Sequence, residues 1–382
     1  MKCVKIVLIL FAIFIFFVPS ITKANDEVLE SQKEALNISD FINTANEYSK
    51  KTFPEINMKE VLNSAVTGKV SGGFWQKIAK TIIGRETTNA IRILGTVLGI
   101  IIIHSILKSI SDGLENKGVS QIIYYVEYIL IVTLIMTNFA EMIKITKETI
   151  ENLVGFMNSL APILITLMVT TGNIATANIV QPVVLIIIGF IGNIIVTLIL
   201  PFIMISTVLG IISNISSKVQ IGKLSKYFKS SIVWILGVTL TIFVGVISIE
   251  GTLSSSVDGI TAKTAKAAVT NFIPVVGKIL GDAVDAVLGA AVILKNAVGF
   301  VGVLVIISIC AVPIIRLAIL TITYHIATAI CEIIADEKIV KILEQMAGSF
   351  KILLATLFSV STMLLIGVTL VIKISNSGLM YR

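Results

Sequence analysis

The most informative shortage in this 382-residue chain is charge. Only 14% of its residues are Asp, Glu, Lys or Arg, whereas 55% are hydrophobic and the mean hydropathy is +0.98. A soluble globular domain carries about 25% charged and 45–50% apolar residues, so this chain has too few charges to cover a water-facing surface. The composition excludes an ordinary soluble domain and predicts an all-α protein that crosses a membrane several times.

Residues that bind metals or form disulfides are also scarce. The chain has three cysteines and two histidines. Cys310 and Cys331 fall in one apolar stretch without a paired spacing, which argues against a disulfide framework or a metal site. His104 and His325 lie in different apolar runs, without the motifs of an active site, and are interpreted as polar packing residues. The sequence therefore predicts no enzyme, no metal site and no cofactor.

The positively charged residues of the chain indicate how it is oriented in the membrane. Thirty Lys and Arg against 23 Asp and Glu give a net charge of +7. In a soluble chain this excess would suggest a nucleic-acid partner. Here the lysines lie between apolar runs, which is the usual topology signal of membrane proteins, so no nucleic-acid partner is expected.

The N-terminus has the pattern of a secretory signal peptide. A basic start precedes an apolar run from Ile6 to Val18, and small residues follow up to Ala24. This signature predicts cleavage after Ala24, although an uncleaved anchor would give the same topology. The acidic stretch that follows can form short amphipathic helices but no independent core. We expect a signal peptide at 1–24, an extracytoplasmic segment at 25–85 and a multi-span membrane domain at 86–382.

Six apolar runs are long enough to cross the hydrocarbon core, which takes about 20 residues of helix. They cover residues 91–107, 122–143, 180–212, 232–249, 298–334 and 352–372. Two weaker stretches surround Pro162 and Pro274. If the first of these crossed the membrane, a loop with four lysines between 218 and 229 would lie outside, against the positive-inside rule. We therefore expect both proline-led segments to be re-entrant or interfacial, on the outer side.

The prolines also suggest a parallel internal repeat. The interval from Pro162 to Pro201 equals the interval from Pro274 to Pro313. Each block would hold a partial insertion, a long proline-kinked helix, an inside loop and a final span. Internal repeats are common in membrane transport folds, and helix breaks are tolerated where protein or water satisfies the freed carbonyl. Chance spacing among seven prolines is the alternative.

Ionisable residues inside the apolar runs are candidate functional residues, because a charge at the bilayer centre is costly and needs a partner or water. Arg316 lies three residues after Pro313, too deep for easy snorkelling. It therefore requires a structural partner or an aqueous pathway. Glu127 lies among three tyrosines, which favours a position at the membrane interface.

The segment Pro274–Asn296 is amphipathic. Its apolar residues recur at helical spacing, with Lys278, Asp282 and Asp285 between them. Glycines and alanines about four residues apart would let a second helix approach closely. The pattern fits an oligomer contact or a pore lining, and equally an interfacial helix that packs on its own bundle.

These features together resemble a known family. An acidic outer segment follows the signal peptide, and the multi-span body contains the short segments Leu160–Pro162, Asn271–Val275 and Gly281–Ala283. In length and order, nearly the whole chain resembles the stage III sporulation protein AE family.

The resemblance implies a protein made in the mother cell of an endospore-forming bacterium and located in the membrane around the forespore. It would belong to a transenvelope channel similar to specialised secretion systems, with other membrane subunits and a forespore protein as partners. The family has no catalytic residues, so none are carried over. A stand-alone secondary transporter and a non-conducting scaffold are the alternatives, because kinked helices, the repeat and Arg316 suit a transporter equally.

Overall fold

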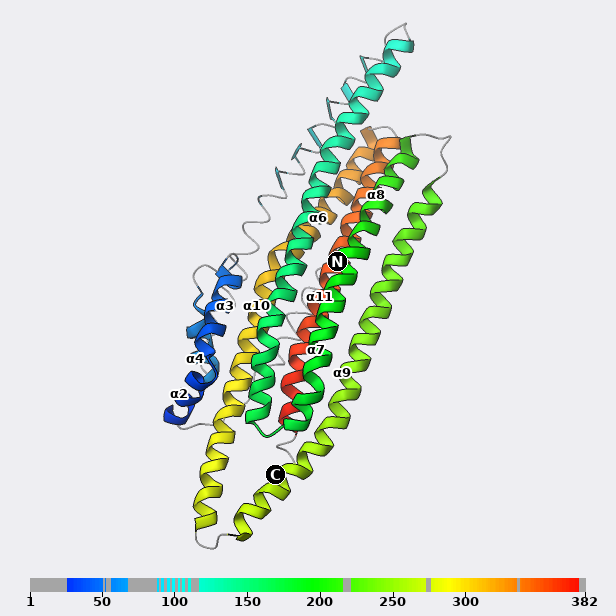
Figure 1. Ribbon diagram of the computed structural model, residues 1–382. Helices are drawn as coiled ribbons and strands as arrows, with labels where there is room; N and C mark the ends of the chain where they lie inside the picture. The colour runs from blue at the N-terminus through cyan, green and yellow to red at the C-terminus, as the bar shows by residue number, and fades with distance from the viewer. Residues whose placement is uncertain are drawn as a thin grey trace.

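The computed structural model describes residues 26–50, 52, 56–67, 117–215, 221–272, 276–334 and 337–377, with scattered positions between 88 and 110. The elements in these ranges are all helical (Figure 1). They are α2 (Asp26–Ala35), α3 (Ile38–Lys50), α4 (Met58–Thr67), α6 (Lys117–Thr170), α7 (Ile174–Ile194), the π-helical turn η1 (Ile195–Ile199), α8 (Leu200–Ile215), α9 (Gly222–Phe272), α10 (Val276–Ile334) and α11 (Glu337–Ser377). The all-α polytopic fold predicted from the sequence is confirmed.

Five apolar stretches in the described part of the chain are long enough to cross a membrane. They are Tyr128–Thr170, Thr176–Asn214, Gly222–Val246, Ala286–Ile333 and Glu337–Lys373. Each contains or overlaps one of the expected runs. The signal peptide at 1–24 and much of the first expected span at 91–107 lie outside the described residues.

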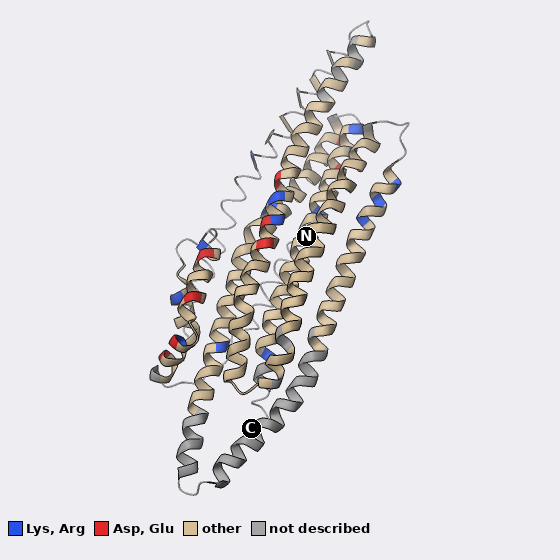
Figure 2. Ribbon diagram, in the orientation of Figure 1, with Lys and Arg blue, Asp and Glu red and all other residues tan. Residues whose placement is uncertain are grey.

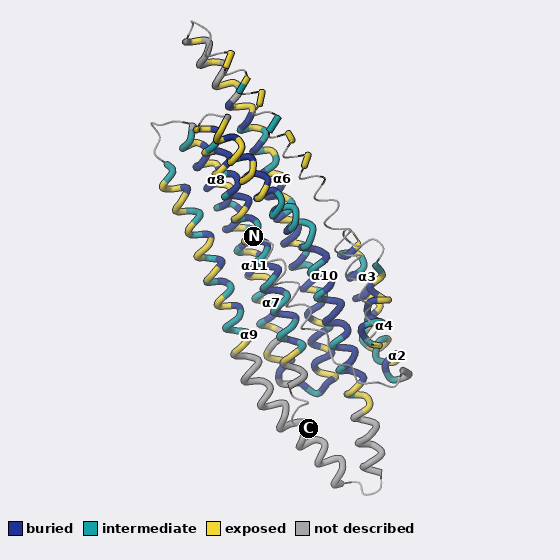
Figure 3. Tube along the Cα trace, turned by 180° about the vertical axis from the view of Figure 1, so that it is seen from behind, coloured by how far each residue is buried: buried dark blue, intermediate teal, exposed yellow. Residues whose placement is uncertain are grey.

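The long helices form an up-and-down bundle (Figure 1). One end holds the start of α6 and the α8–α9 and α10–α11 connections, and the other holds the α6–α7 turn and the α9–α10 connection. We call these the inner and outer ends, following the orientation that the lysines predict. Helices α10 and α11 pack on each other at the centre (Figure 3). α9 lies at the periphery of the bundle. In its most apolar stretch 22% is buried, whereas in the most apolar stretch of α10 61% is buried.

Pro162 does not begin an element of its own. It lies inside α6, which continues to Thr170. There the Asn173 N–H bonds to the Met168 carbonyl at 3.0 Å and the Gly172 N–H to the Val169 carbonyl at 2.9 Å. This is a Schellman turn, and it requires the positive φ of 83° that Gly172 adopts without strain. The Pro162 segment is therefore the outer part of a 54-residue helix.

The expected break at Pro201 takes the form of a π turn. The N–H of Leu200 bonds to the carbonyl of Ile195, five residues back instead of four. In a regular α-helix the Pro201 ring would clash with the carbonyl of Thr197, and Pro201 has no N–H to donate. The wider turn just before the proline accommodates both effects, so α7, η1 and α8 form one continuous rod. At Pro313, by contrast, α10 continues as an α-helix.

The two proline pairs do not mark equal structural intervals. Between Pro162 and Pro201 the chain reverses direction at the turn that contains Gly172. From residue 276 to Pro313 it is one uninterrupted helix, and Pro274 lies outside the described residues. The repeat therefore stays an interpretation of the sequence.

Candidate functional site

A group of polar side chains joins three helices near the inner end of the bundle. It consists of Ser206 and Thr207 from α8, Ser225 and Lys229 from α9, and Gln345 and Ser349 from α11. We call this group the inner polar network. All six side chains are buried or half-buried.

Ser206 and Ser225 form a reciprocal contact between α8 and α9. The Ser206 hydroxyl donates to the Ser225 carbonyl at 3.0 Å, and the Ser225 hydroxyl donates to the Ser206 carbonyl at 2.7 Å. Serine is small enough to let the two backbones approach this closely. Because both hydroxyls have acceptors, burying them costs little.

Gln345 uses both ends of its side-chain amide. Its oxygen accepts from the Lys229 ammonium at 2.9 Å, and its nitrogen donates to the Ser206 carbonyl at 3.3 Å. One turn along α11, the Ser349 hydroxyl contacts the Thr207 hydroxyl at 2.8 Å. Gly210 leaves the space that the amide fills, since a Cβ there would overlap the Gln345 side chain. α11 thus holds the inner ends of α8 and α9 together.

The chemistry of the network is structural. Its members are hydroxyls, an amide and one ammonium, and polar side chains of this kind hold membrane helices together. Among the described residues, no group of three His, Cys, Asp or Glu could hold a metal ion.

The sequence interpretation missed this network. Lys229 was expected in a loop with three other lysines, but α9 already begins at Gly222. Lys223 and Lys226 lie in its first turns and are exposed, whereas Lys229 reaches Gln345. The polar residues were visible inside apolar runs, but their partners lie 19 to 142 residues away and no local spacing reveals them.

Arg316 has the partner that its position required. Its Nη2 lies 2.8 Å from Oε1 of Glu141 on α6, and the two side chains are 29% and 52% exposed. Glu141 begins a run of charges on α6 that continues through Lys144, Lys147, Glu148 and Glu151, visible along the middle of that helix (Figure 2). The structure therefore supports a structural ion pair for Arg316.

Helices α2–α4, which we call the cap, lie against α6 and α10. The Thr52 hydroxyl donates to the Ser308 carbonyl at 2.7 Å, and the Gln32 amide donates to the Val287 carbonyl at 2.9 Å. The rings of Phe41 and Tyr48 pack on Phe156 of α6, with centroids 6.3 and 5.6 Å apart. The cap shares one continuous hydrophobic core with the bundle.

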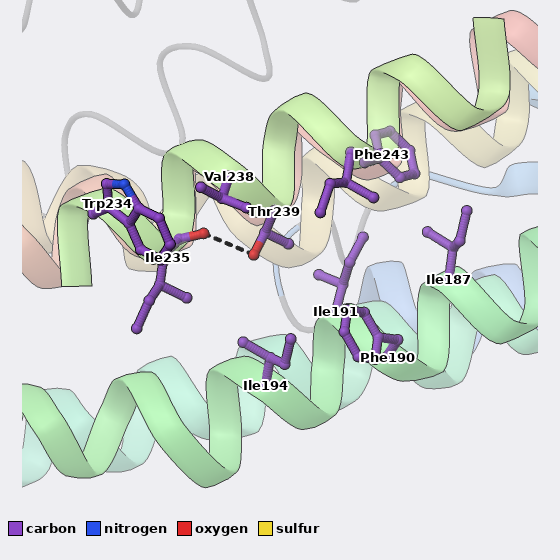
Figure 4. Close-up of a pocket in the computed structure, with 10 residues that line it drawn as sticks. Ile187, Phe190, Ile191, Ile194, Trp234, Ile235, Val238, Thr239 and Phe243 are labelled. Atoms are coloured by element: carbon purple, nitrogen blue, oxygen red, sulfur yellow. Dashed lines mark hydrogen bonds between the residues drawn. The ribbon is translucent and has the colours of Figure 1, made fainter. Parts of the chain in front are cut away.

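An apolar pocket opens between α7 and α9 (Figure 4). Its lining comprises Ile187, Phe190, Ile191, Ile194, Trp234, Ile235, Val238, Thr239, Ile242 and Phe243. The Thr239 hydroxyl already donates to the Ile235 carbonyl at 2.8 Å. The pocket therefore offers apolar contact and little else.

The candidate residues predicted from the sequence do not gather at one place. Pro162 lies in the outer part of α6, Pro201 follows the π turn, and Pro313 lies one turn from Arg316 on α10. The side chains of Glu127, Lys278, Asp282 and Asp285 lie outside the described part of α6 and α10, as does all of Pro274.

The bundle, its docked cap and its internal polar contacts define a polytopic helical membrane protein. The family model of stage III sporulation protein AE matches residues 56–375. A relative, the Stage III sporulation protein AE of Bacillus subtilis (strain 168), is 30% identical over 308 residues, covering 81% of this chain and 77% of the relative. The chain therefore belongs to the stage III sporulation protein AE family and is a sporulation-related membrane protein. No solved structure matches it.

Proposed function

We propose that this chain is an integral membrane subunit of a multi-protein transenvelope channel required for endospore formation. It lies in the mother-cell-derived outer forespore membrane, assembles there with other membrane subunits and with further copies of itself, and supports the forespore after engulfment. Family membership supports the role in sporulation. The proposal includes no catalytic step and no cofactor.

The observation that carries the proposal is the attachment of the cap. Thr52 and Gln32 bond to two points of α10, and aromatic rings fix α3 to α6. A channel subunit that connects a membrane to structures beyond it needs a part outside the membrane that cannot swing freely. A cap held by both hydrogen bonds and buried rings meets this requirement.

The polar contacts favour a complex subunit over a stand-alone transporter. Transporter sites place polar groups and broken helix ends around a cavity near the membrane midplane. Here Lys229 is bonded to Gln345 and Arg316 to Glu141, so these two cations hold helices together. A scaffold without conductance is the other alternative, and it shares the same architecture.

The proposal is tested in a sporulating strain that lacks the chain and carries a tagged copy. We expect the tagged copy to restore heat-resistant spores and late forespore gene expression, to localise around the engulfed forespore, and to co-purify with other sporulation membrane proteins after mild crosslinking. If the purified chain alone transports a solute in liposomes and has no membrane partners, the chain is a stand-alone transporter and the proposal is wrong. Assembly of the complex without any conductance would favour the scaffold.

A further inference from the structure

The bundle is longer than a membrane is thick. α6 has 54 residues and α10 has 59. At 1.5 Å per residue these helices span about 81 and 89 Å, against about 30 Å for the hydrocarbon core. Part of each helix must therefore lie outside the core, and the contacts of the cap indicate which part.

The cap covers a long stretch of the outer part of α10. Gln32 bonds to Val287, and Thr52 bonds to Ser308, which lies several turns further along the same helix. The interval from Val287 to Ser308 corresponds to about 32 Å of helix, as much as a whole hydrocarbon core. On α6, Phe156 lies under the same cap through its contacts with Phe41 and Tyr48.

The surface of the cap is too charged for lipid. Its exposed charged residues include Glu30, Glu34, Asp40, Glu47, Lys50, Lys59 and Glu60. A charged side chain at the centre of a membrane is costly and almost always faces protein or water, so lipid cannot surround seven of them on one small surface. The cap, and with it the stretch of bundle that it covers, must therefore lie in water.

The charged residues in the middle of α6 also indicate that the inner part of the bundle lies in the membrane and the outer part in water. Lys144, Lys147, Glu148 and Glu151 are all exposed, and they form i,i+4 pairs with N···O distances of 3.9 and 3.7 Å. Such a run of charges cannot face hydrocarbon without heavy cost. The run of charges begins at Glu141, the partner of Arg316. This ion pair therefore lies at the border between the inner and the outer part of the bundle.

The distance from this border to the inner end matches a bilayer. The part of α6 between Ile122 and Glu141 corresponds to about 29 Å of helix, and the part of α10 between Arg316 and Ile334 to about 27 Å. Both lengths are close to the thickness of the hydrocarbon core.

We propose that the hydrocarbon core covers only the inner part of the bundle and ends at the level of the Glu141–Arg316 pair. The outer part of α6 and α10, together with the cap, stands in extracytoplasmic water as a folded projection about as tall as the membrane is thick. This inference does not depend on the channel function, because it rests on helix lengths, cap contacts and exposed charges.

Two threonines of α6 provide a matched test. Thr137 and Thr166 are both exposed, and each donates to the carbonyl four residues earlier, at 2.8 and 2.9 Å. Thr137→Cys and Thr166→Cys are made in the full chain with Cys3, Cys310 and Cys331 replaced by alanine, and produced without other sporulation proteins. Right-side-out membrane vesicles are then treated with a membrane-impermeant maleimide. We expect Thr166→Cys to react at least tenfold faster than Thr137→Cys.

A second pair of positions keeps the test decisive if either threonine variant fails to fold. Thr133 and Lys147 are also exposed on α6, on opposite sides of Glu141. Lys147→Cys should react and Thr133→Cys should be protected, and all folded variants should react after solubilisation in SDS. Protection of Thr166→Cys or Lys147→Cys in intact vesicles would overturn the proposal, and so would labelling of Thr137→Cys or Thr133→Cys.

Discussion

Lys229 of α9 donates a hydrogen bond to the side-chain oxygen of Gln345 of α11 across 2.9 Å. The nitrogen of the same amide donates to the Ser206 carbonyl of α8 at 3.3 Å. One glutamine of α11 therefore links two consecutive helices, α8 and α9, that lie more than a hundred residues earlier in the sequence. Its removal should loosen the inner end of the bundle without altering the surface.

Gln345→Leu should destabilise the protein by about 2–3 kcal/mol, because it leaves a partly buried ammonium without its acceptor. The matched double variant Lys229→Met/Gln345→Leu removes both partners and should recover at least half of that loss. The measurement is the thermal unfolding midpoint of the purified chain in detergent. A double variant less stable than Gln345→Leu would show that the Lys229–Gln345 bond is not the source of the effect.

Gly210→Ala should act on the same bond from the other side. Its new methyl group overlaps the Gln345 side chain, which must then move away from Lys229 and Ser206. We expect a loss of about 1–2 kcal/mol, although alanine otherwise favours a helix by up to about 1 kcal/mol. Gly237→Ala on α9 is the control, since a Cβ there meets nothing within 4 Å. Equal effects of the two variants in the same unfolding assay would contradict this explanation.

Reversal of the charges tests the ion pair between α6 and α10. Arg316→Glu places a carboxylate beside Glu141 and should lower the amount of folded protein in membranes. Exchanging both residues, as Glu141→Arg with Arg316→Glu, restores opposite charges and should recover most of it. Glu148→Arg, in the exposed charged run of α6, is a suitable control and should have little effect. Immunoblots of membrane fractions and spore counts provide the readouts. Failure of the exchange to improve on Arg316→Glu would mean that the pair contributes nothing.

The attachment of the cap can be tested at Phe41. This ring is 2% exposed and packs on Phe156, so Phe41→Ala should cost about 3–5 kcal/mol locally and release the cap from the bundle. Limited proteolysis should then cleave the cap rapidly while the membrane helices stay intact. Asn43→Ala, at an exposed position of the same helix, should leave the cap resistant. If both variants resist protease equally, the cap is not held by this contact.

The sequence was sufficient to predict the fold class and the five expected spans that fall within the described residues. Each span is a local property, since a run of apolar residues long enough to cross the core is visible wherever it occurs. Arg316 was singled out for the same reason, as a charge inside such a run. The need for a partner could be argued from energy, but Glu141 lies on a helix far earlier in the chain and its identity could not be inferred.

The inner polar network could not be predicted for a related reason. Ser206, Ser225 and Gln345 are common residues with no motif, and their importance comes from meeting at one place. The cap is similar, because Thr52 bonds to a backbone carbonyl, which every residue offers, and only packing selects Ser308. The parallel repeat stays a prediction, because Pro274 lies outside the described residues.

The π turn at Ile195–Ile199 affects how the chain is compared with its relatives. A π turn holds one more residue than an α turn over nearly the same path, so it is where a helix absorbs an insertion. A one-residue deletion in α7, or in α8 before Ser206, would rotate everything beyond it by about 100° and separate Ser206 and Thr207 from their partners. A deletion inside this turn, made together with Pro201→Ala, would return the rod to α-helical register and keep both contacts. Relatives one residue shorter at this point, without the proline, would be expected to retain the same network.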